Sequence, residues 1–402
     1  MYQQMKDIDQ TSNNPWAVFL IFLRLGLTSF GGPVAHLSYF RDEFVLKRRW
    51  LSERSYADLV ALCQFLPGPA SSQVGMALGL SRCGYIGAAV AWAGFTLPSA
   101  IMLMLFAFGI SSESTVISAG ALHGLKVVAV AVVAQAVWGM ARNLCQDVSR
   151  ITIMAASACL MLTQPSAWGQ VGVIGVAALA GRLLFKPESD VTHESFSASI
   201  SHRAGLFWLT AFVVILLGLP FLTTLVPDQT LMMTDGFYRA GALVFGGGHV
   251  VLPLLQTLVV PTGWVSNESF LAGYGAAQAV PGPLFTFAAF LGASMDTGLP
   301  NWLNGLIGLF AVFAPSFLLV AGALPFWDSL RRNIGMQAAL AGINAAVVGL
   351  LLAALYQPVW TSAIHAPQDF AFALVAFIAL LFWKAPPWVV VIISGVVGHL
   401  IC

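Results

Sequence analysis

Residues 22–32, FLRLGLTSFGG, recur as FYRAGALVFGG at residues 237–247, and this pair of stretches decides how the chain is built. Both copies continue with a tryptophan, a serine two residues later, a glutamine and then Pro-Gly-Pro. These residues are Trp50, Ser52, Gln64 and Pro67-Gly68-Pro69 in the first copy, and Trp264, Ser266, Gln278 and Pro281-Gly282-Pro283 in the second. Arg239 follows Arg24 by 215 residues, and Pro281 follows Pro67 by 214. So constant an offset over so many unlike residues indicates an internal duplication.

The composition is that of a membrane protein. Of the 402 residues, 58% are hydrophobic and 9% are charged, whereas about a quarter of the residues in a soluble domain are charged. Apolar stretches of about 18 residues or more, the length that crosses a hydrocarbon layer, recur throughout. The five cysteines show no metal-ligand spacing, and we expect no cofactor and no metal. The formal net charge of +1 gives no indication of nucleic-acid binding.

Thirteen apolar segments predict an all-α polytopic membrane protein with helices broken at the FGG and PGP motifs. They lie at residues 16–30, 58–80, 84–109, 117–141, 151–163, 169–185, 205–226, 237–260, 270–295, 301–325, 335–357, 369–383 and 386–402. We divide the chain into a first repeat (residues 1–185), a linker with a connecting transmembrane helix (186–235), and a second repeat (236–402). An odd connecting span inverts the second copy, which gives the inverted-topology repeat of many secondary transporters.

Lysine and arginine placement predicts the orientation. Loops on the N-terminal side hold ten of these residues, and loops on the other side hold five, all within residues 41–54. The positive-inside rule therefore predicts a cytoplasmic N-terminus and a periplasmic C-terminus. If the breaks at residues 30–33 and 67–69 fold the chain into re-entrant hairpins, residues 41–54 also return to the cytoplasmic side. We prefer this hairpin arrangement to full spans; both give the same ends.

Three cations lie inside apolar segments: Arg24, Arg239 and Lys126, whose counterpart in the second copy is Asn344. A charge at mid-bilayer costs several kcal/mol, so such residues commonly mark a transport pathway. The nearest carboxylates, Asp58, Asp235, Asp296 and Asp328, all fall near segment ends. We therefore expect a doubly charged anion to neutralise the arginines through paired guanidinium hydrogen bonds. The alternative is that the arginines snorkel to the membrane interface.

The breaks Phe30-Gly31-Gly32 and Phe245-Gly246-Gly247, together with the two PGP motifs, interrupt helices at membrane depth. Broken helices expose backbone amides that can bind an anion; the alternative is a kink that only improves packing. Gln64 and Gln278 can orient the oxygen atoms of such an anion. Further polar contacts can come from Ser71, Ser72, Gln73 and Thr286, which can equally bond to freed backbone. We interpret His36 and His249 as structural.

The chain resembles the chromate ion transporter family in its long, two-domain form. The resemblance is carried by FLRLGLTSFGGPVAHLSYF with LPGP and by FYRAGALVFGGGHVVLPLL with VPGP, and it covers essentially the whole chain. It implies a bacterial inner-membrane carrier that exports chromate and confers chromate resistance. The resemblance also implies that sulfate competes with chromate, and that transport draws on the membrane potential or the proton gradient rather than on ATP. The family pattern marks Arg24, Gly31, Gly32, Gln64, Pro67, Gly68, Pro69, Arg239, Gly246, Gly247, Gln278, Pro281, Gly282 and Pro283.

The predicted function is therefore secondary active chromate efflux by an antiporter. Two alternatives stay open: a transporter of sulfate or another tetrahedral oxyanion, and an anion channel. An enzyme is disfavoured because the sequence has no haem, flavin or CxxC pattern. The identity of the coupling ion stays open, as does the choice between a monomer and a homodimer.

Overall fold

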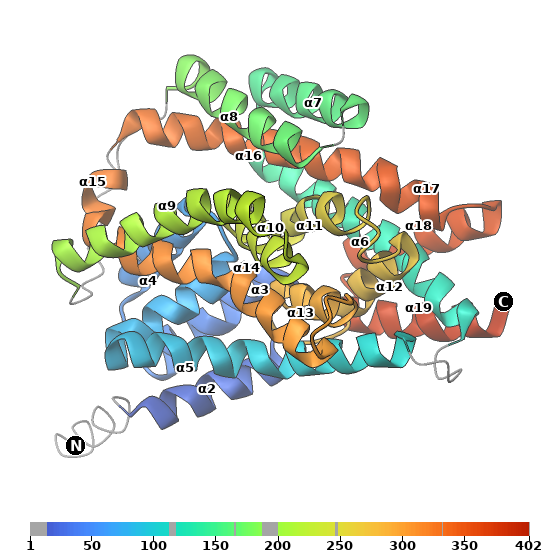
Figure 1. Ribbon diagram of the computed structural model, residues 1–402, viewed down its shortest axis with the longest axis horizontal. Coiled ribbons are helices and arrows are strands. Elements are labelled where there is room, and N and C mark those ends of the chain that lie inside the picture. Colours follow the sequence, from blue (N-terminus) through green and yellow to red (C-terminus); the bar gives the residue numbers. More distant parts are fainter. Residues whose placement is uncertain are drawn as a thin grey trace.

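The computed structural model describes residues 14–111, 118–164, 166–186, 200–245, 248–331 and 333–401, and every regular element in these ranges is a helix (Figure 1). Within them, five helical stretches are long and apolar enough to cross a membrane. These are Ala70–Ile110, Gly120–Leu144, His202–Leu225, Asn301–Phe326 and Ile334–Ala363. The predicted all-helical membrane class is confirmed; the count of thirteen segments stays a prediction.

The two halves contain helices in a similar order. The first half holds α2 (Pro15–Thr28), α3 (Gly32–Arg41), η1 (Asp42–Lys47), α4 (Glu53–Phe65), α5 (Ala70–Ser111), α6 (Ala119–Leu144), α7 (Val148–Thr163) and α8 (Ala167–Leu184). Helix α9 (His202–Leu225) connects the halves. The second half holds α10 (Gln229–Leu243), η2 (Gly248–Val250), α11 (Val251–Val259), α12 (Asn267–Ala277), η3 (Leu284–Thr286), α13 (Phe287–Ala293), α14 (Asn301–Ala323), η4 (Leu324–Phe326), α15 (Trp327–Arg331), α16 (Ile334–Ala354), η5 (Leu355–Trp360), α17 (Thr361–Ala363), α18 (Pro367–Leu381) and α19 (Pro387–Ile401).

Equivalent serines start α4 and α12 in the same way. Ser52 Oγ accepts the N–H of Ser55 at 3.1 Å, and Ser266 Oγ accepts the N–H of Ser269 at 3.1 Å. Each serine satisfies one of the amides that a helix start leaves unpaired. A serine therefore caps this helix start in both copies.

The FGG breaks fold the chain back on itself. Phe22 and Phe40 flank the first break, and their ring centroids lie 5.7 Å apart, so the chain turns back toward α2 after the break. Gly31 permits this reversal with a φ of +100°, in the left-handed region that favours glycine. In the second half, Gly236 of α10 packs against Leu258 of α11. The apolar segment predicted at residues 237–260, with its predicted break at the FGG motif, therefore contains two helices that pack against each other.

Each PGP motif also reverses the chain. Gly273 of α12 packs against Phe290 of α13 across the second motif. Across the first, the Arg82 guanidinium lies 4.7 Å from the Trp50 ring. Helix α5 then bends again at Gly84, whose φ is +61°, so its limbs 70–82 and 85–111 pack side by side with Gly79 against Gly87.

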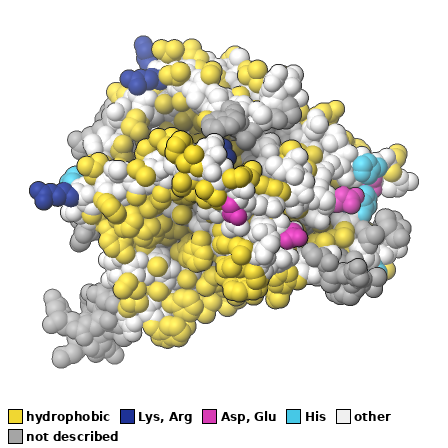
Figure 2. Space-filling view, in the orientation of Figure 1, with side chains coloured by type: hydrophobic (Ala, Val, Ile, Leu, Met, Phe, Trp, Pro, Cys, Tyr) yellow, Lys and Arg dark blue, Asp and Glu magenta, His cyan; other side chains and the backbone are white. Residues whose placement is uncertain are grey.

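These hairpins bring residues 41–54 back to the end of the molecule where α2 begins. In Figure 1 the N-terminus and α4 lie at the left, and the C-terminus lies at the right. On the face that Figure 2 shows, the lysine and arginine side chains lie mainly toward the left, with a histidine beside one of them, and the acidic side chains lie toward the centre and right. These reversals agree with the preferred re-entrant arrangement, which stays a prediction.

The halves exchange their last helix pairs. Helices α7 and α8 pack on α16 of the second half, and α18 and α19 pack on α6 of the first. The close approaches are made by equivalent glycines, with Gly181 against Gly342 and Gly398 against Gly124. Neither half can therefore pack fully without the other.

Candidate functional site

The four chain breaks meet at one place through two reciprocal hydrogen bonds. Gly68 N–H of the first PGP donates to Val244 O at 2.7 Å, and Gly282 N–H of the second PGP donates to Ser29 O at 2.9 Å. Ser29 and Val244 are equivalent residues, each directly before an FGG motif. Every PGP motif therefore bonds to the FGG segment of the opposite half. We call this meeting point the crossing.

Glycine is required at the centre of both PGP motifs. Gly68 has a φ of +122° and Gly282 a φ of +100°, which side chains rarely adopt. A Cβ on Gly68 would overlap Ser316 Oγ, and a Cβ on Gly282 would lie 2.9 Å from Ser99 Oγ. The backbone can approach these serines only because no side chain intervenes.

The two serines come from equivalent positions outside the repeated motifs. Ser99 lies in α5 directly after Pro98, and Ser316 lies in α14 directly after Pro315. Both serines are fully buried. The repeated Pro-Ser pair, 217 residues apart, was a signal of the same duplication and could have placed them in the site.

Buried polar atoms without a hydrogen-bond partner gather in and beside the breaks. In the part of the chain that the structure describes, they include Ser29 Oγ, Ser72 Oγ, Gln73 Oε1, Thr96 Oγ1, Gln278 Nε2 and Ser316 Oγ. Buried polar groups are nearly always hydrogen-bonded, and leaving one unsatisfied costs about 1–3 kcal/mol. Such a group of hydroxyls and amides can bind a small polar ligand together with water.

His36 supports the crossing from α3. Its Nε2 lies 3.2 Å from Ser29 O, the carbonyl that also accepts Gly282 N–H, and its Nδ1 lies 3.4 Å from Ser71 Oγ. In the second half, His249 Nδ1 lies 2.7 Å from the hydroxyl of the buried Tyr274. Both histidines have the hydrogen-bonded, structural setting that the sequence predicted.

Arg239 has a carboxylate partner, so the prediction that it lacks one is wrong. Its Nη2 donates to Asp235 Oδ2 at 2.6 Å and its Nε to Asp235 Oδ1 at 3.1 Å. Only 5% of the Asp235 side chain is exposed. The apolar pattern set the segment start at residue 237, whereas α10 begins at Gln229 and places Asp235 one turn before the arginine.

Lys126 is also paired, contrary to prediction. Its Nζ lies 3.4 Å from Glu268 Oε1, with 12% of the lysine and 82% of the glutamate side chain exposed. The partner comes from the opposite half, 142 residues later, because α12 packs along α6. The counterpart of Lys126, Asn344, is half-buried on α16.

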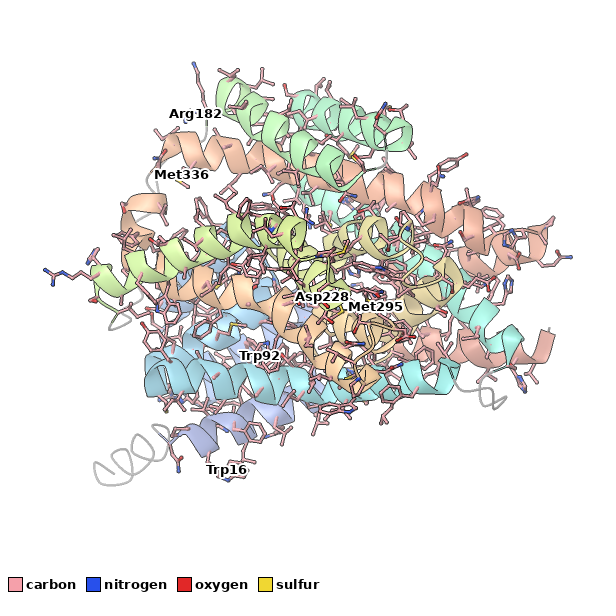
Figure 3. All side chains as sticks on the ribbon, in the orientation of Figure 1. Trp16, Trp92, Arg182, Asp228, Met295 and Met336 are labelled. Atoms are coloured by element: carbon pink, nitrogen blue, oxygen red, sulfur yellow. The ribbon has the colours of Figure 1, made fainter. Side chains whose placement is uncertain are left out.

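Arg24 faces away from the packed interior. It is exposed on α2 together with Leu20 and Leu27, while Phe22 and Leu25 on the other face are buried. Trp16, on the same outer face, lies at the lower edge of the molecule in Figure 3. Leu20 stands where the second half has Asp235. The structure therefore gives Arg24 and Arg239 different surroundings and does not form the expected arginine pair.

The other predicted residues lie in or near the breaks. Phe30 is half-buried, with its ring centroid 5.6 Å from that of Trp388, and Phe245 is half-buried after α10. Gln73 Nε2 donates to Pro67 O at 2.7 Å. Gln64 is exposed near the end of α4, and Gln278 is half-buried at the end of α12. Gly32, Pro69, Pro281 and Pro283 belong to the described breaks, whereas Gly246 and Gly247 lie outside the described residues.

Comparison with known proteins gives full-length matches. A family model described as chromate transporter matches residues 16–182 and again residues 231–399. An uncharacterized transporter of Methanocaldococcus jannaschii is 28% identical over 98% of this chain and 97% of its own. A chromate transport protein of Pseudomonas aeruginosa is 28% identical over 96% of this chain and 92% of its own. An uncharacterized transporter of Bacillus subtilis is 29% identical over 40% of this chain and 82% of its own. No solved structure matches the chain.

Proposed function

Because this chain belongs to the chromate transporter family, we propose that it is a secondary active antiporter that exports chromate and confers chromate resistance. The protein would lie in the bacterial inner membrane, with its N-terminus in the cytoplasm and its C-terminus in the periplasm. The gathering of lysine and arginine at the N-terminal end supports this orientation.

The substrate would bind at the crossing. The observation that carries this proposal is the pair of reciprocal hydrogen bonds, Gly68 to Val244 and Gly282 to Ser29, surrounded by buried hydroxyls and amides without partners. Serine hydroxyls and the Gln278 amide can donate to the oxygens of a tetrahedral oxyanion. Helices α3 and α5 begin at the breaks, and their N-terminal dipoles favour negative charge there.

Charge at this site would therefore be met by several neutral donors rather than by an arginine pair. Arg239 is already neutralised by Asp235, and Arg24 faces outward. Neutral hydroxyl and amide donors would suit the four oxygens of chromate and of sulfate equally well. Sulfate is thus the expected competitor and the first alternative cargo.

Alternating access would come from two halves of inverted orientation. This is supported by the equivalent hairpins at the FGG and PGP breaks, by the single long helix α9 between the halves, and by the exchanged terminal helix pairs. Rocking of one set of hairpins against the other would open the crossing to each side in turn.

Transport by the purified protein in proteoliposomes tests this proposal. We expect chromate to accumulate against its gradient when a pH or voltage gradient is imposed, and to emerge chemically unchanged as Cr(VI). Flux that only dissipates gradients would indicate an anion channel. Uptake of sulfate that chromate does not inhibit would assign the protein to another oxyanion.

A further inference from the structure

Helices α4 and α12 are equivalent, yet α12 packs along a helix of the opposite half, whereas α4 contacts the second half at its C-terminal end, where the Phe65 ring centroid lies 5.6 Å from that of Trp327. Gly275 of α12 lies so close to α6 that a Cβ there would be 2.6 Å from Leu125 O. The Lys126–Glu268 ion pair joins the same two helices at 3.4 Å. This end of the molecule is closed by direct packing between the halves.

The corresponding face of α4 is open. It consists of Arg54, Ala57, Ala61 and Gln64, which we call the α4 stripe, and all four residues are exposed. Their counterparts in α12 are Glu268, Leu271, Gly275 and Gln278, of which Leu271 and Gly275 are buried. By the same equivalence the partner of α4 is α16, but among the described residues these helices show no packing comparable to that of α12 on α6. The symmetry of the two halves is broken at this contact.

The composition of the α4 stripe suits water rather than lipid. Residues three and four apart lie on one face of a helix, so the stripe carries Arg54 at the helix start, two alanines, and Gln64 beside the first PGP motif. The exposed surface of α9, in contrast, carries large apolar side chains such as Leu206 and Phe207. A helix face with small side chains in its middle and polar side chains at both ends, leading to a chain break, is typical of the lining of an aqueous path.

We propose that the α4 stripe lines the path by which a divalent oxyanion reaches the crossing from the end that holds residues 41–54, and that α4 closes on α16 after loading. This inference rests on the proposed function and adds the path and the closing partner. In the closed arrangement Ala61 would lie against Ile343, and Arg54 near Asn344. Helix α12 would then separate from α6, breaking the Lys126–Glu268 pair and opening the opposite end.

The charges at the two ends favour this direction. Arg54 and Glu268 occupy equivalent positions two residues after the capping serines Ser52 and Ser266. Arg54 at the loading end attracts a dianion, whereas Glu268 at the release end is paired with Lys126, so that pair adds no net positive charge there. Such local fields change association rates for charged ligands, and salt screens them.

Cysteine chemistry in a variant without the five native cysteines tests the path. We expect Ala61→Cys to react with a membrane-impermeant maleimide in inside-out vesicles. Leu59→Cys, on the fully buried face of the same helix, should react only after denaturation, which also shows that the thiol is present. Reaction of Ala61→Cys with a membrane-permeant maleimide alone would mean that the stripe faces lipid, and would overturn the proposal.

Cross-linking tests the closure. We expect Lys126→Cys with Glu268→Cys to cross-link at rest, and Ala61→Cys with Ile343→Cys to cross-link during turnover with chromate or sulfate. The control pair Leu59→Cys with Ile343→Cys should not cross-link. If Ala61→Cys and Ile343→Cys do not cross-link while transport is measurable, the proposed closure of α4 on α16 is overturned. Maleimide labelling needs no substrate, so it tests the path separately from transport. If Ala61→Cys is labelled and Leu59→Cys is not, but the protein transports neither chromate nor sulfate, the proposed function is rejected and the aqueous path along the α4 stripe is retained.

Discussion

The amide of Gly68 donates to the carbonyl of Val244 at 2.7 Å, although 176 residues separate them in the sequence. The equivalent bond joins Gly282 and Ser29 at 2.9 Å. Each bond satisfies backbone groups that a broken helix leaves free, which is a condition for irregular backbone at membrane depth. Since each half supplies the hydrogen-bond acceptor for the PGP motif of the other half, the breaks of one half depend on those of the other.

Gly68→Ala should both destabilise the protein and abolish transport. A residue with a side chain is strained at a φ of +122°, by about 1–3 kcal/mol, and its Cβ would overlap Ser316 Oγ. Gly139→Ala on α6 is the matched control, because a Cβ there meets nothing within 4 Å. Thermal unfolding in detergent and chromate efflux should be measured together. A fully stable and active Gly68→Ala protein would contradict the assigned role of the crossing.

Ser316→Ala should weaken oxyanion transport while leaving stability almost unchanged. The Ser316 hydroxyl is buried without a protein partner in the described structure, so its removal leaves no protein hydrogen bond broken. Loss of one ligand hydrogen bond of about 1–1.5 kcal/mol corresponds to an apparent affinity about tenfold weaker. Concentration-dependent uptake measures this change. Ser329→Ala, whose hydroxyl is bonded to Phe326 O on an exposed turn, is the control; equal uptake by both variants would exclude Ser316 from the site.

The duplicated motifs predicted the breaks well, because glycine and proline act on local backbone. The positive φ of Gly31, Gly68 and Gly282 follows from the absence of a side chain, which is visible in the sequence. The serine caps at Ser52 and Ser266 are equally local.

The charge partners could not be predicted in the same way, because they depend on tertiary packing or on helix length. Glu268 reaches Lys126 only because α12 packs along α6. Asp235 reaches Arg239 because α10 starts eight residues before the apolar run begins at Phe237. The outward direction of Arg24 depends on which face of α2 packs against α5, and that face is set by contacts with Gly94 and Phe95.

Asp235→Asn should destabilise the protein by leaving the Arg239 guanidinium without its carboxylate. Removing one partner of a largely buried ion pair costs about 3–5 kcal/mol, whereas replacing both with apolar residues is often neutral. The double variant Asp235→Leu with Arg239→Leu should therefore recover most of the lost thermal stability. Efflux by the double variant then distinguishes a structural role of the pair from a role of Arg239 in transport. Restored transport would mean that the pair is structural, whereas a stable but inactive protein would mean that Arg239 acts in the substrate path.

Arg24→Ala tests whether an arginine of the duplicated motif takes part in binding. Because Arg24 is exposed on the outer face of α2 beside Leu20, we expect the variant to insert, fold and retain chromate resistance. Removing a charge that costs about 2.5–3.5 kcal/mol at mid-membrane should leave membrane insertion unchanged or improve it. Growth in chromate and the amount of protein in the membrane should be measured in the same cells. Leu20→Ala on the same face is the control for loss of surface area. A variant present at normal levels but sensitive to chromate would show that Arg24 contributes to transport in another conformation, and would contradict a binding site formed by the crossing alone.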